Sequence, residues 1–175
     1  SVDTSMGFTP LAGLPMGTRA GDLDAGILQY LMNKYNMGID EMLNILNKKS
    51  GMEGISGVSS DFRDLEEGAE KGNERCALAR EKFAYEVKKL IGAYAAVMGG
   101  VDAIIFTAGV GENDALERMQ IASGLEYMGV KMDEDANNVR GEERVISATD
   151  SKVKVLLIPT NEELMIAMDT ASLVG

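Results

Sequence analysis

The chain has 175 residues, of which 45% are hydrophobic, so it is long enough to bury the core of one domain. Its formal net charge of −11 argues against a nucleic-acid partner, because phosphate-backbone binding requires a basic face that releases counterions. The sequence contains no histidine, the commonest general base and metal ligand, and its single cysteine, Cys76, excludes an internal disulfide. Neither a signal peptide nor an apolar run of membrane length is present, which predicts a soluble protein of the cytoplasm that does not bind membranes.

The first part of the chain predicts a strand, a loop and two helices. Residues 1–7 alternate apolar and polar side chains, as a short strand does, and residues 8–22 form a loop rich in glycine and proline. Asp24 is the predicted N-cap of a helix over residues 25–36, and Asp40 is the predicted N-cap of the next helix. Because glycine lets a backbone pass close to a ligand, the loop is a candidate binding segment.

A long helix is predicted from Asn73 to Met98, after a segment rich in glycine and serine. Apolar residues recur at helical spacing along one face of it, which indicates that this face is buried. These residues are Cys76, Ala79, Phe83, Val87, Leu90, Ile91 and Tyr94.

The remaining residues predict strands that alternate with helices. The expected elements are a buried strand in 101–109, a helix from Asn113 to Met128, strands in 143–148 and 153–160, and a last helix from Asn161 to Leu173. Such alternation is typical of an α/β fold. No internal repeat, low-complexity tract or linker divides the chain, so the sequence predicts one globular unit.

The stretch "FTAGVGENDA", residues 106–115, is a candidate ligand site. A buried strand that runs through Gly109 and Gly111 into a helix is typical of the crevice at the carboxyl end of an α/β sheet. It is a poor dinucleotide fingerprint, because Asp114 stands where the third glycine should be, and Glu112 and Asp114 would repel a pyrophosphate. These acids would suit ribose hydroxyls better. The alternative, equally supported by spacing alone, is a helix start whose acids complement the helix dipole.

A second junction of the same form is "IPTNEEL", residues 158–164. Thr160 and Glu163 form a predicted capping box, T-x-x-E, at the start of the last helix. Glu162 has no such structural assignment and is a candidate ligand of a divalent cation. A solvated glutamate at a helix end is the alternative.

Two arginines are candidates for phosphate or base contacts. Arg19 lies between glycines in the first loop, where its guanidinium could face a phosphoryl group, and the alternative is an ion pair with Asp22. Arg63 could lie flat on a purine ring. In the same segment, Ser60 or Asp61 is a candidate cap of the following turn.

Four segments taken together resemble the acetate and propionate kinases of the acetate and sugar kinase, Hsc70 and actin superfamily. The stretch "SVDTSMGFTPLAGLPMGTRAGDLD" resembles the family's signature, and "NKKSGMEGISGVSSDFRDLEEG", "DAIIFTAGVGEN" and "IPTNEEL" match in the same order at compatible spacings. The resemblance spans essentially the whole chain. It implies an RNase H-like, actin-like ATPase fold, in which a mixed sheet is flanked by helices, here without its first strands.

The resemblance also implies roles for individual residues. Arg19 matches an arginine that stabilises the transferring phosphoryl group, Glu162 matches the glutamate that positions magnesium, and Pro10 matches a wall of the pocket for the acetate methyl group. The implied nucleotide-binding residues are Asp61, Phe62, Arg63, Gly109, Gly111, Glu112 and Asn113.

The reaction implied by the resemblance is reversible transfer of the γ-phosphoryl group of ATP to acetate, which gives acetyl phosphate and ADP. Magnesium is the expected metal, although Glu162 would also accept manganese. Three alternatives stay open: a propionate kinase, a sugar kinase of the same superfamily, and a noncatalytic ATP-binding module of the actin or Hsc70 type. The signature arginine Arg19 and the apolar wall at Pro10 favour the carboxylate kinase.

The resemblance further implies that residues 1–175 are the C-terminal nucleotide-binding and dimerisation domain of a two-domain kinase. The matching family members carry a preceding N-terminal domain with further catalytic residues, so the chain alone is expected to be inactive. Its missing strands would leave the "DAIIFT" strand with an unpaired edge. The sequence therefore predicts self-association, as a homodimer through this domain.

Overall fold

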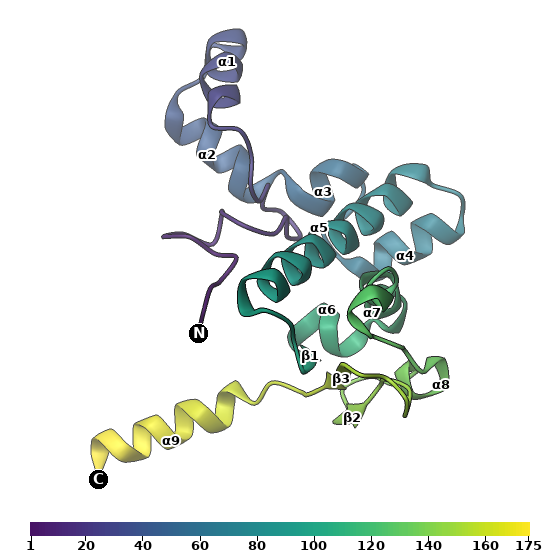
Figure 1. Ribbon diagram of the computed structural model, residues 1–175. Helices are drawn as coiled ribbons and strands as arrows, with labels where there is room; N and C mark the ends of the chain where they lie inside the picture. Colours follow the sequence, from purple (N-terminus) through teal and green to yellow (C-terminus); the bar gives the residue numbers. More distant parts are fainter. The chain divides into compact units, whose positions relative to one another are not determined.

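A computed structural model describes all residues from Ser1 to Gly175. The chain folds into two compact units, Ser1–Gly100 and Val101–Gly175 (Figure 1). The boundary follows Gly99 and Gly100, whose φ angles of 76° and 129° are conformations that residues with a Cβ rarely adopt. This division was not predicted from the sequence, because it occurs at a helix end with two glycines and not in a polar linker.

The first unit is built of helices. They are α1 (Gly26–Tyr35), α2 (Ile39–Lys48), α3 (Gly51–Ser56), α4 (Phe62–Glu70) and α5 (Glu74–Met98). The helices α3 and α4 both pack on α5, and their contact buries Met52, Leu65 and Cys76 completely. Cys76 lies directly against α4, since a Cβ on Gly68 would stand 2.6 Å from its Sγ.

The long helix α5 confirms the prediction. Its N-cap is Asn73, whose side chain accepts hydrogen bonds from the backbone N–H groups of Arg75 (3.0 Å) and Cys76 (3.3 Å). Of the predicted apolar face, Cys76, Ala79 and Phe83 are buried, whereas Val87 and the residues after it are half-buried.

Three predictions for the first unit were wrong. Residues 1–7 form no strand, because a strand requires a neighbour to receive its hydrogen bonds and no strand pairs with this segment. Ala25, not Asp24, precedes α1, and the Asp24 carboxylate instead accepts a bond from the Gly26 N–H (2.9 Å). Asp40 lies inside the first turn of α2, whose N-cap is Gly38.

The second unit contains a mixed sheet with the order β1-β3-β2. The strands are β1 (Ala103–Phe106), β2 (Arg144–Val145) and β3 (Lys154–Leu157). β1 runs parallel to β3, with Ala103 opposite Lys154, and β2 runs antiparallel to β3. The central strand is the most buried, since Val155 and Leu157 have no exposed surface.

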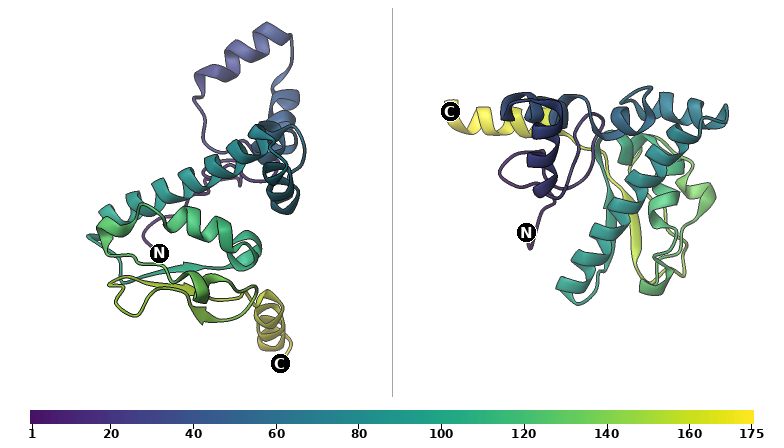
Figure 2. Two further views of the ribbon diagram at one scale, coloured as in Figure 1. Left: turned by 90° about the vertical axis from the view of Figure 1, so that its right-hand side faces the viewer. Right: turned by 90° about the horizontal axis from the view of Figure 1, so that it is seen from above.

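Helices flank this sheet. They are α6 (Ala108–Asn113), α7 (Ala115–Ala122), α8 (Glu134–Asn137) and α9 (Glu162–Val174), with a 3₁₀ turn η1 (Glu126–Met128). Figure 2 shows α7 running over one face of the sheet, where Ile121 and Ala122 are buried. The α/β class and the mixed sheet flanked by helices are confirmed.

The predicted single helix from Asn113 to Met128 is divided between the end of α6, α7 and η1. Asp114 leaves the helical conformation (φ −117°, ψ 94°) and caps α7 by accepting a bond from the Glu117 N–H at 2.8 Å, and α7 ends at Ala122. The glycines expected in a turn, Gly109 and Gly111, lie within the short helix α6.

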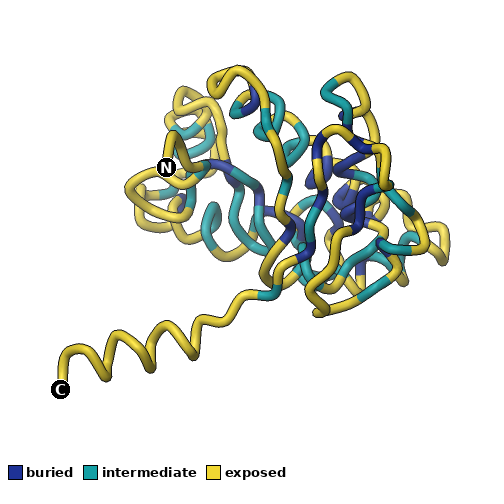
Figure 3. The backbone as a smooth tube through the Cα atoms, turned by 60° about the horizontal axis from the view of Figure 1, so that its bottom comes forward, coloured by how far each residue is buried: buried dark blue, intermediate teal, exposed yellow.

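Two apolar surfaces of the second unit are exposed. β1 pairs with β3 alone, so its other edge is open, and Ile105 is 54% exposed. Helix α9 has no buried residue and extends from the unit (Figure 3). Exposed apolar side chains on α9 include Leu164, Met165, Ile166, Met168 and Leu173. No helix combines the length and apolar character needed to cross a membrane.

Candidate functional site

The loop that carries Arg19 is held in place by the segment around the start of α3. We call residues 16–20 the arginine loop. Its carbonyl groups at Met16, Gly17 and Thr18 accept hydrogen bonds of 2.9 Å, and its Ala20 N–H donates one of 2.8 Å. The partners of these bonds are the N–H groups of Met52, Glu53 and Ser50 and the carbonyl of Leu46. A loop with this many backbone bonds holds Arg19 at a fixed place in the first unit.

Gly51 allows this close approach. Its φ is +59°, and a Cβ built on it would lie 2.0 Å from the carbonyl oxygen of Met16 and 2.6 Å from that of Arg19. No side chain fits at that distance. The contact between the arginine loop and the start of α3 therefore requires glycine at this position.

The side chain of Arg19 is half-buried, and the alternative interpretation, an ion pair with Asp22, is not seen. Asp22 Oδ1 accepts a hydrogen bond from the Gly13 N–H at 2.8 Å and so stabilises the backbone of the glycine-rich loop. Pro10 is exposed on the same glycine-rich segment. Arg19 therefore forms no ion pair with the neighbouring acid Asp22.

Asp61, Phe62 and Arg63 form the start of α4. Asp61 is the N-cap, accepting from the Arg63 N–H at 2.9 Å, and its carboxylate also forms a two-point pair with the Arg63 guanidinium at 3.0 and 2.6 Å. Phe62 packs edge-on against Phe83, with ring centroids 4.8 Å apart. The capping interpretation of Asp61 is confirmed, and the side chain of Arg63 is 85% exposed.

The bonds from Arg63 lower the pKa of Asp61 from 3.8 to about 2. Because the carboxylate form is favoured in the folded chain, its contribution to stability is present above pH 3.8 and is lost as the pH falls toward 2. We expect NMR titration of the Asp61 carboxyl carbon to show this low midpoint. In Arg63→Ala the midpoint should move up toward 3.8, and a midpoint unchanged by the substitution would contradict the pair.

The two predicted junctions of the second unit meet in one pocket, which we call the carboxyl-end pocket. Because β1 and β3 are parallel, their carboxyl ends lie at the same edge of the sheet, and the segments that follow them face each other there. The pocket has a volume of about 450 Å³. Its lining residues are Ala108, Gly109, Glu112, Thr160, Asn161, Glu162 and Glu163. The predicted crevice is thus present, with Gly109, Glu112 and Glu162 in its walls.

Glu112 connects the two sides of the carboxyl-end pocket. Its Oε1 accepts hydrogen bonds from the Ala108 N–H at 2.6 Å and from the Thr160 N–H at 2.7 Å. The bond from Thr160, and then that from Ala108, lowers the pKa of Glu112 below its usual value. Nearby, the hydroxyl groups of Thr107 and Thr160 lie 2.7 Å apart in a further bond across the same gap.

The predicted capping box of the last helix was wrong. Asn161 is the N-cap of α9 and accepts from the Leu164 N–H at 3.1 Å. Thr160 cannot fill that role, because its hydroxyl is bonded to Thr107. Glu163 therefore has no capping function and lines the pocket beside Glu162.

The other residues of "GVGEN" have local structural roles. The Asn113 side chain donates to the carbonyl of Gly109 at 2.9 Å, within α6. A Cβ on Gly111 would meet Phe106 at an ordinary 3.5 Å, whereas a Cβ on Gly109 would meet nothing within 4 Å. Neither glycine has a positive φ. Local backbone geometry therefore does not explain why glycine stands at position 109.

A magnesium ion fits the carboxyl-end pocket only with help from a substrate. No group of three acidic, histidine or cysteine side chains is arranged to hold a metal ion. Magnesium, however, commonly takes one or two carboxylates together with substrate phosphates and water. Glu162, exposed in the pocket wall, supplies a carboxylate suited to that arrangement.

Sequence reasoning missed Arg118, which holds the backbone of α6 beside the pocket. This fully buried arginine on α7 donates to the carbonyls of Gly111 (2.9 Å) and Val139 (2.7 Å) and to Oδ1 of Asn137 (2.8 Å). Burial lowers the pKa of its guanidinium. The only indication of its burial in the sequence was a charged residue at an apolar position of a helix. That pattern does not indicate which groups Arg118 bonds.

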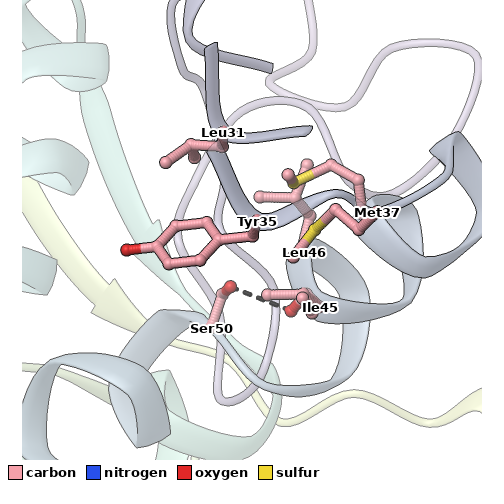
Figure 4. Close-up of a pocket in the computed structure, with 7 residues that line it drawn as sticks. Leu31, Tyr35, Met37, Ile45, Leu46 and Ser50 are labelled. Carbon is pink, nitrogen blue, oxygen red and sulfur yellow. Dashed lines mark hydrogen bonds between the residues drawn. The ribbon is translucent and has the colours of Figure 1, made fainter. Parts of the chain in front are cut away.

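A second cavity, of about 380 Å³, lies between α1 and α2 in the first unit (Figure 4). Its lining is apolar apart from the hydroxyl groups of Tyr35 and Ser50, and the Ser50 hydroxyl donates to the Ile45 carbonyl at 2.9 Å. The lining residues are Leu31, Tyr35, Met37, Met42, Ile45, Leu46 and Ser50. None of the residues predicted to bind substrate or nucleotide lies in it.

The predicted site residues fall into two groups. Pro10, Arg19 and the start of α4 belong to the first unit, and the "GVGEN" residues and Glu162 belong to the second. Within the second unit, the carboxyl-end pocket brings Gly109, Glu112 and Glu162 together. Within the first, the arginine loop and the start of α4 are each fixed by their own hydrogen bonds, and they come close at Gly17, where a Cβ would lie 3.1 Å from the carbonyl oxygen of Ser60.

Comparison with known proteins identifies relatives of the whole chain. Residues 1–168 match the Acetokinase family. An acetate kinase of Dictyoglomus turgidum is 62% identical over 175 residues, which make up 100% of this chain and 43% of that protein. The crystal structure of Porphyromonas gingivalis acetate kinase superposes with a TM-score of 0.93 at 48% identity, covering 98% of this chain and 43% of that one.

A propionate kinase from Francisella tularensis is more distant, with a TM-score of 0.87 and 41% identity over 94% of this chain and 42% of that one. The chain spans less than half the length of each of these relatives. The match to the Dictyoglomus turgidum protein nevertheless runs from one end of the chain to the other, through the arginine loop and both walls of the carboxyl-end pocket. The chain belongs to the acetokinase family.

Proposed function

We propose that this chain is the C-terminal nucleotide-binding and dimerisation domain of an acetate kinase. The parent enzyme would transfer the γ-phosphoryl group of ATP reversibly to acetate. The observation that carries the proposal is the 62% identity to an acetate kinase over the full length of the chain. The cytoplasm is the proposed location, and the proposed partners are ATP, acetate, the N-terminal domain of the parent and a second copy of the chain.

The chemistry suits a chain without histidine. A carboxylate is already a nucleophile, so the reaction requires in-line positioning and neutralisation of charge on the phosphoryl oxygens more than it requires a general base. Arg19, held by the arginine loop, would donate to the phosphoryl oxygens, and Glu162 would hold a magnesium ion that neutralises phosphate charge. Pro10 would form part of the apolar wall against the acetate methyl group.

The nucleotide would bind through two segments. Gly109 and Gly111 would let the adenosine approach the backbone at the carboxyl-end pocket, with Glu112 and Asn113 beside it. Asp61, Phe62 and Arg63 would border the adenine and ribose. The open space above Gly109 supports this assignment, because a helical glycine without a structural reason costs about 1 kcal/mol relative to alanine.

Calorimetric titration of the chain with ATP and magnesium tests the nucleotide site. We expect binding by the natural chain and its loss in Gly109→Val, because the added side chain would fill the space beside the pocket. Gly38→Val is the matched control: a Cβ there also meets nothing within 4 Å, and Gly38 lies in the other unit. If Gly109→Val bound ATP as well as the control, the assignment of "GVGEN" to the nucleotide would be wrong.

A propionate kinase is the second candidate, favoured by the Francisella tularensis structure. The two functions differ in the size of the acyl pocket, and Pro10 is the only residue of this chain assigned to that pocket. Ratios of kcat/KM for acetate and propionate in the parent enzyme separate them. One methylene group in an apolar pocket is worth roughly 10- to 200-fold in such a ratio.

A further inference from the structure

The role of Glu112 follows from the geometry of its carboxylate. Spacing in the sequence suggested a contact with ribose hydroxyls, but Oε1 already accepts two short hydrogen bonds from backbone N–H groups. One comes from Ala108, the residue that follows β1 and Thr107, and the other comes from Thr160, after β3. A single oxygen thus joins the two segments that form the walls of the carboxyl-end pocket.

Ala108 has an unfavourable conformation that this bond helps to hold. Its φ is 57°, in the left-handed region, and apart from Asn36 it is the only non-glycine residue of the chain with a positive φ. Residues with a Cβ adopt this conformation only where surrounding interactions impose it. The bond from the Ala108 N–H to Glu112 is one such interaction, because it fixes the peptide group at the start of the strained residue.

The main chain at Glu112 is anchored as well. Its carbonyl accepts a hydrogen bond from the Gly141 N–H at 3.1 Å, and the preceding carbonyl, of Gly111, accepts one from the buried Arg118. The Glu112 side chain therefore extends from a fixed base to the opposite wall. Turning Oε1 toward a ligand would release the amide groups of both walls at once.

We propose that Glu112 is a positioning residue, which keeps the carboxyl-end pocket in its binding conformation by joining the backbone of Ala108 to that of Thr160, and that it does not contact the nucleotide through its carboxylate. The inference deepens the proposed function and rests on it only for the identity of the ligand. The pocket geometry itself holds for any ligand of this pocket.

Three substitutions at Glu112 separate bonding from charge. Glu112→Gln keeps an oxygen that accepts both bonds but removes the charge, whereas Glu112→Asp keeps the charge on a side chain one methylene shorter. Glu112→Ala removes both. Glu143→Ala is the matched control, because Glu143 is an exposed glutamate of the same unit outside the pocket.

The first readout is hydrogen exchange of the chain without nucleotide. We expect the Ala108 and Thr160 N–H groups to be protected in the natural chain, in Glu112→Gln and in the control, and to exchange faster in Glu112→Asp and Glu112→Ala. Protection of the Ile158 N–H, which bonds the Phe106 carbonyl at 3.0 Å, reports whether each variant keeps its sheet. Equal exchange of Ala108 and Thr160 in all variants would overturn the proposal. If Glu112→Ala does not fold, the pair Glu112→Gln and Glu112→Asp decides.

The second readout compares ADP with 2′,3′-dideoxy-ADP in the presence of magnesium. If Glu112 is a positioning residue, Glu112→Ala should lower the affinity for both ligands by the same factor. The expected factor is about 10- to 100-fold, the size of loss seen when residues that support a binding site from outside are removed. Glu112→Gln should stay close to the natural chain. A loss confined to ADP would show a direct bond to the ribose hydroxyls and overturn the proposal. If the natural chain binds neither nucleotide, the proposed nucleotide site fails, while the exchange experiment still decides the role of Glu112.

Discussion

Arg19→Ala is expected to lower the rate of phosphoryl transfer in the intact parent enzyme by about 10³- to 10⁵-fold, the range known for arginine assistance in this chemistry. The loss should fall on kcat, because the guanidinium would bond to charge that develops on the transferring group. The arginine loop is fixed by backbone bonds that do not involve the Arg19 side chain, so the fold should survive. Steady-state kinetics with ATP and acetate, together with calorimetric ATP binding, measure both effects.

Arg19→Lys is the informative companion. Lysine keeps the positive charge but not the planar pair of donors, so most of the loss should remain. If nucleotide binding and turnover fell by the same factor in Arg19→Ala, the residue would bind the ground state as strongly as the transition state, and the assigned role would be wrong.

Gly51→Ala is expected to destabilise the first unit by about 2 to 5 kcal/mol, the sum of a left-handed conformation and an overpacked contact. The added Cβ would stand 2.0 Å from the Met16 carbonyl oxygen, so the arginine loop must move away from α3. Urea denaturation of the chain measures the stability. In the intact enzyme, we expect any folded fraction to have lost activity, because the loop that carries Arg19 would be displaced.

Gly109→Ala provides the stability control for Gly51→Ala. Gly109 is helical, and its added Cβ meets no atom within 4 Å, so alanine there should be neutral or stabilising by up to about 1 kcal/mol. If the two alanine variants unfolded at the same urea concentration, the close contact at Gly51 would not be needed for the fold.

Local signals in the sequence predicted much of the secondary structure. The apolar face at helical spacing predicted α5, and the apolar runs predicted β1 and β3, because such periodicity acts over a few residues. Residues 1–7 have the pattern of a strand but form none. A strand depends on a partner from elsewhere in the chain, and a pattern within seven residues carries no information about that partner.

The sequence predicted which segments form the candidate site, but it did not predict the hydrogen bonds between them. The glycines near residue 110 and the acids near 162 marked both walls of the carboxyl-end pocket, since a parallel pair of strands brings its carboxyl ends together. The bond between Glu112 and the Thr160 N–H spans 48 positions, and that between Arg118 and Asn137 spans 19. Neither bond can be read from local spacing, which is why the sequence indicated neither the link from Glu112 to Thr160 nor the role of Arg118.

The burial of Cys76 beneath Gly68 gives the chain an internal reporter. This side chain is the only thiol and has no exposed surface, so an alkylating reagent reaches it only when α4 separates from α5. The alkylation rate therefore measures how often the first unit opens under native conditions, without any signal from the second unit. Stability differences within one half of the chain can thus be followed by mass spectrometry, without denaturant and without an engineered label.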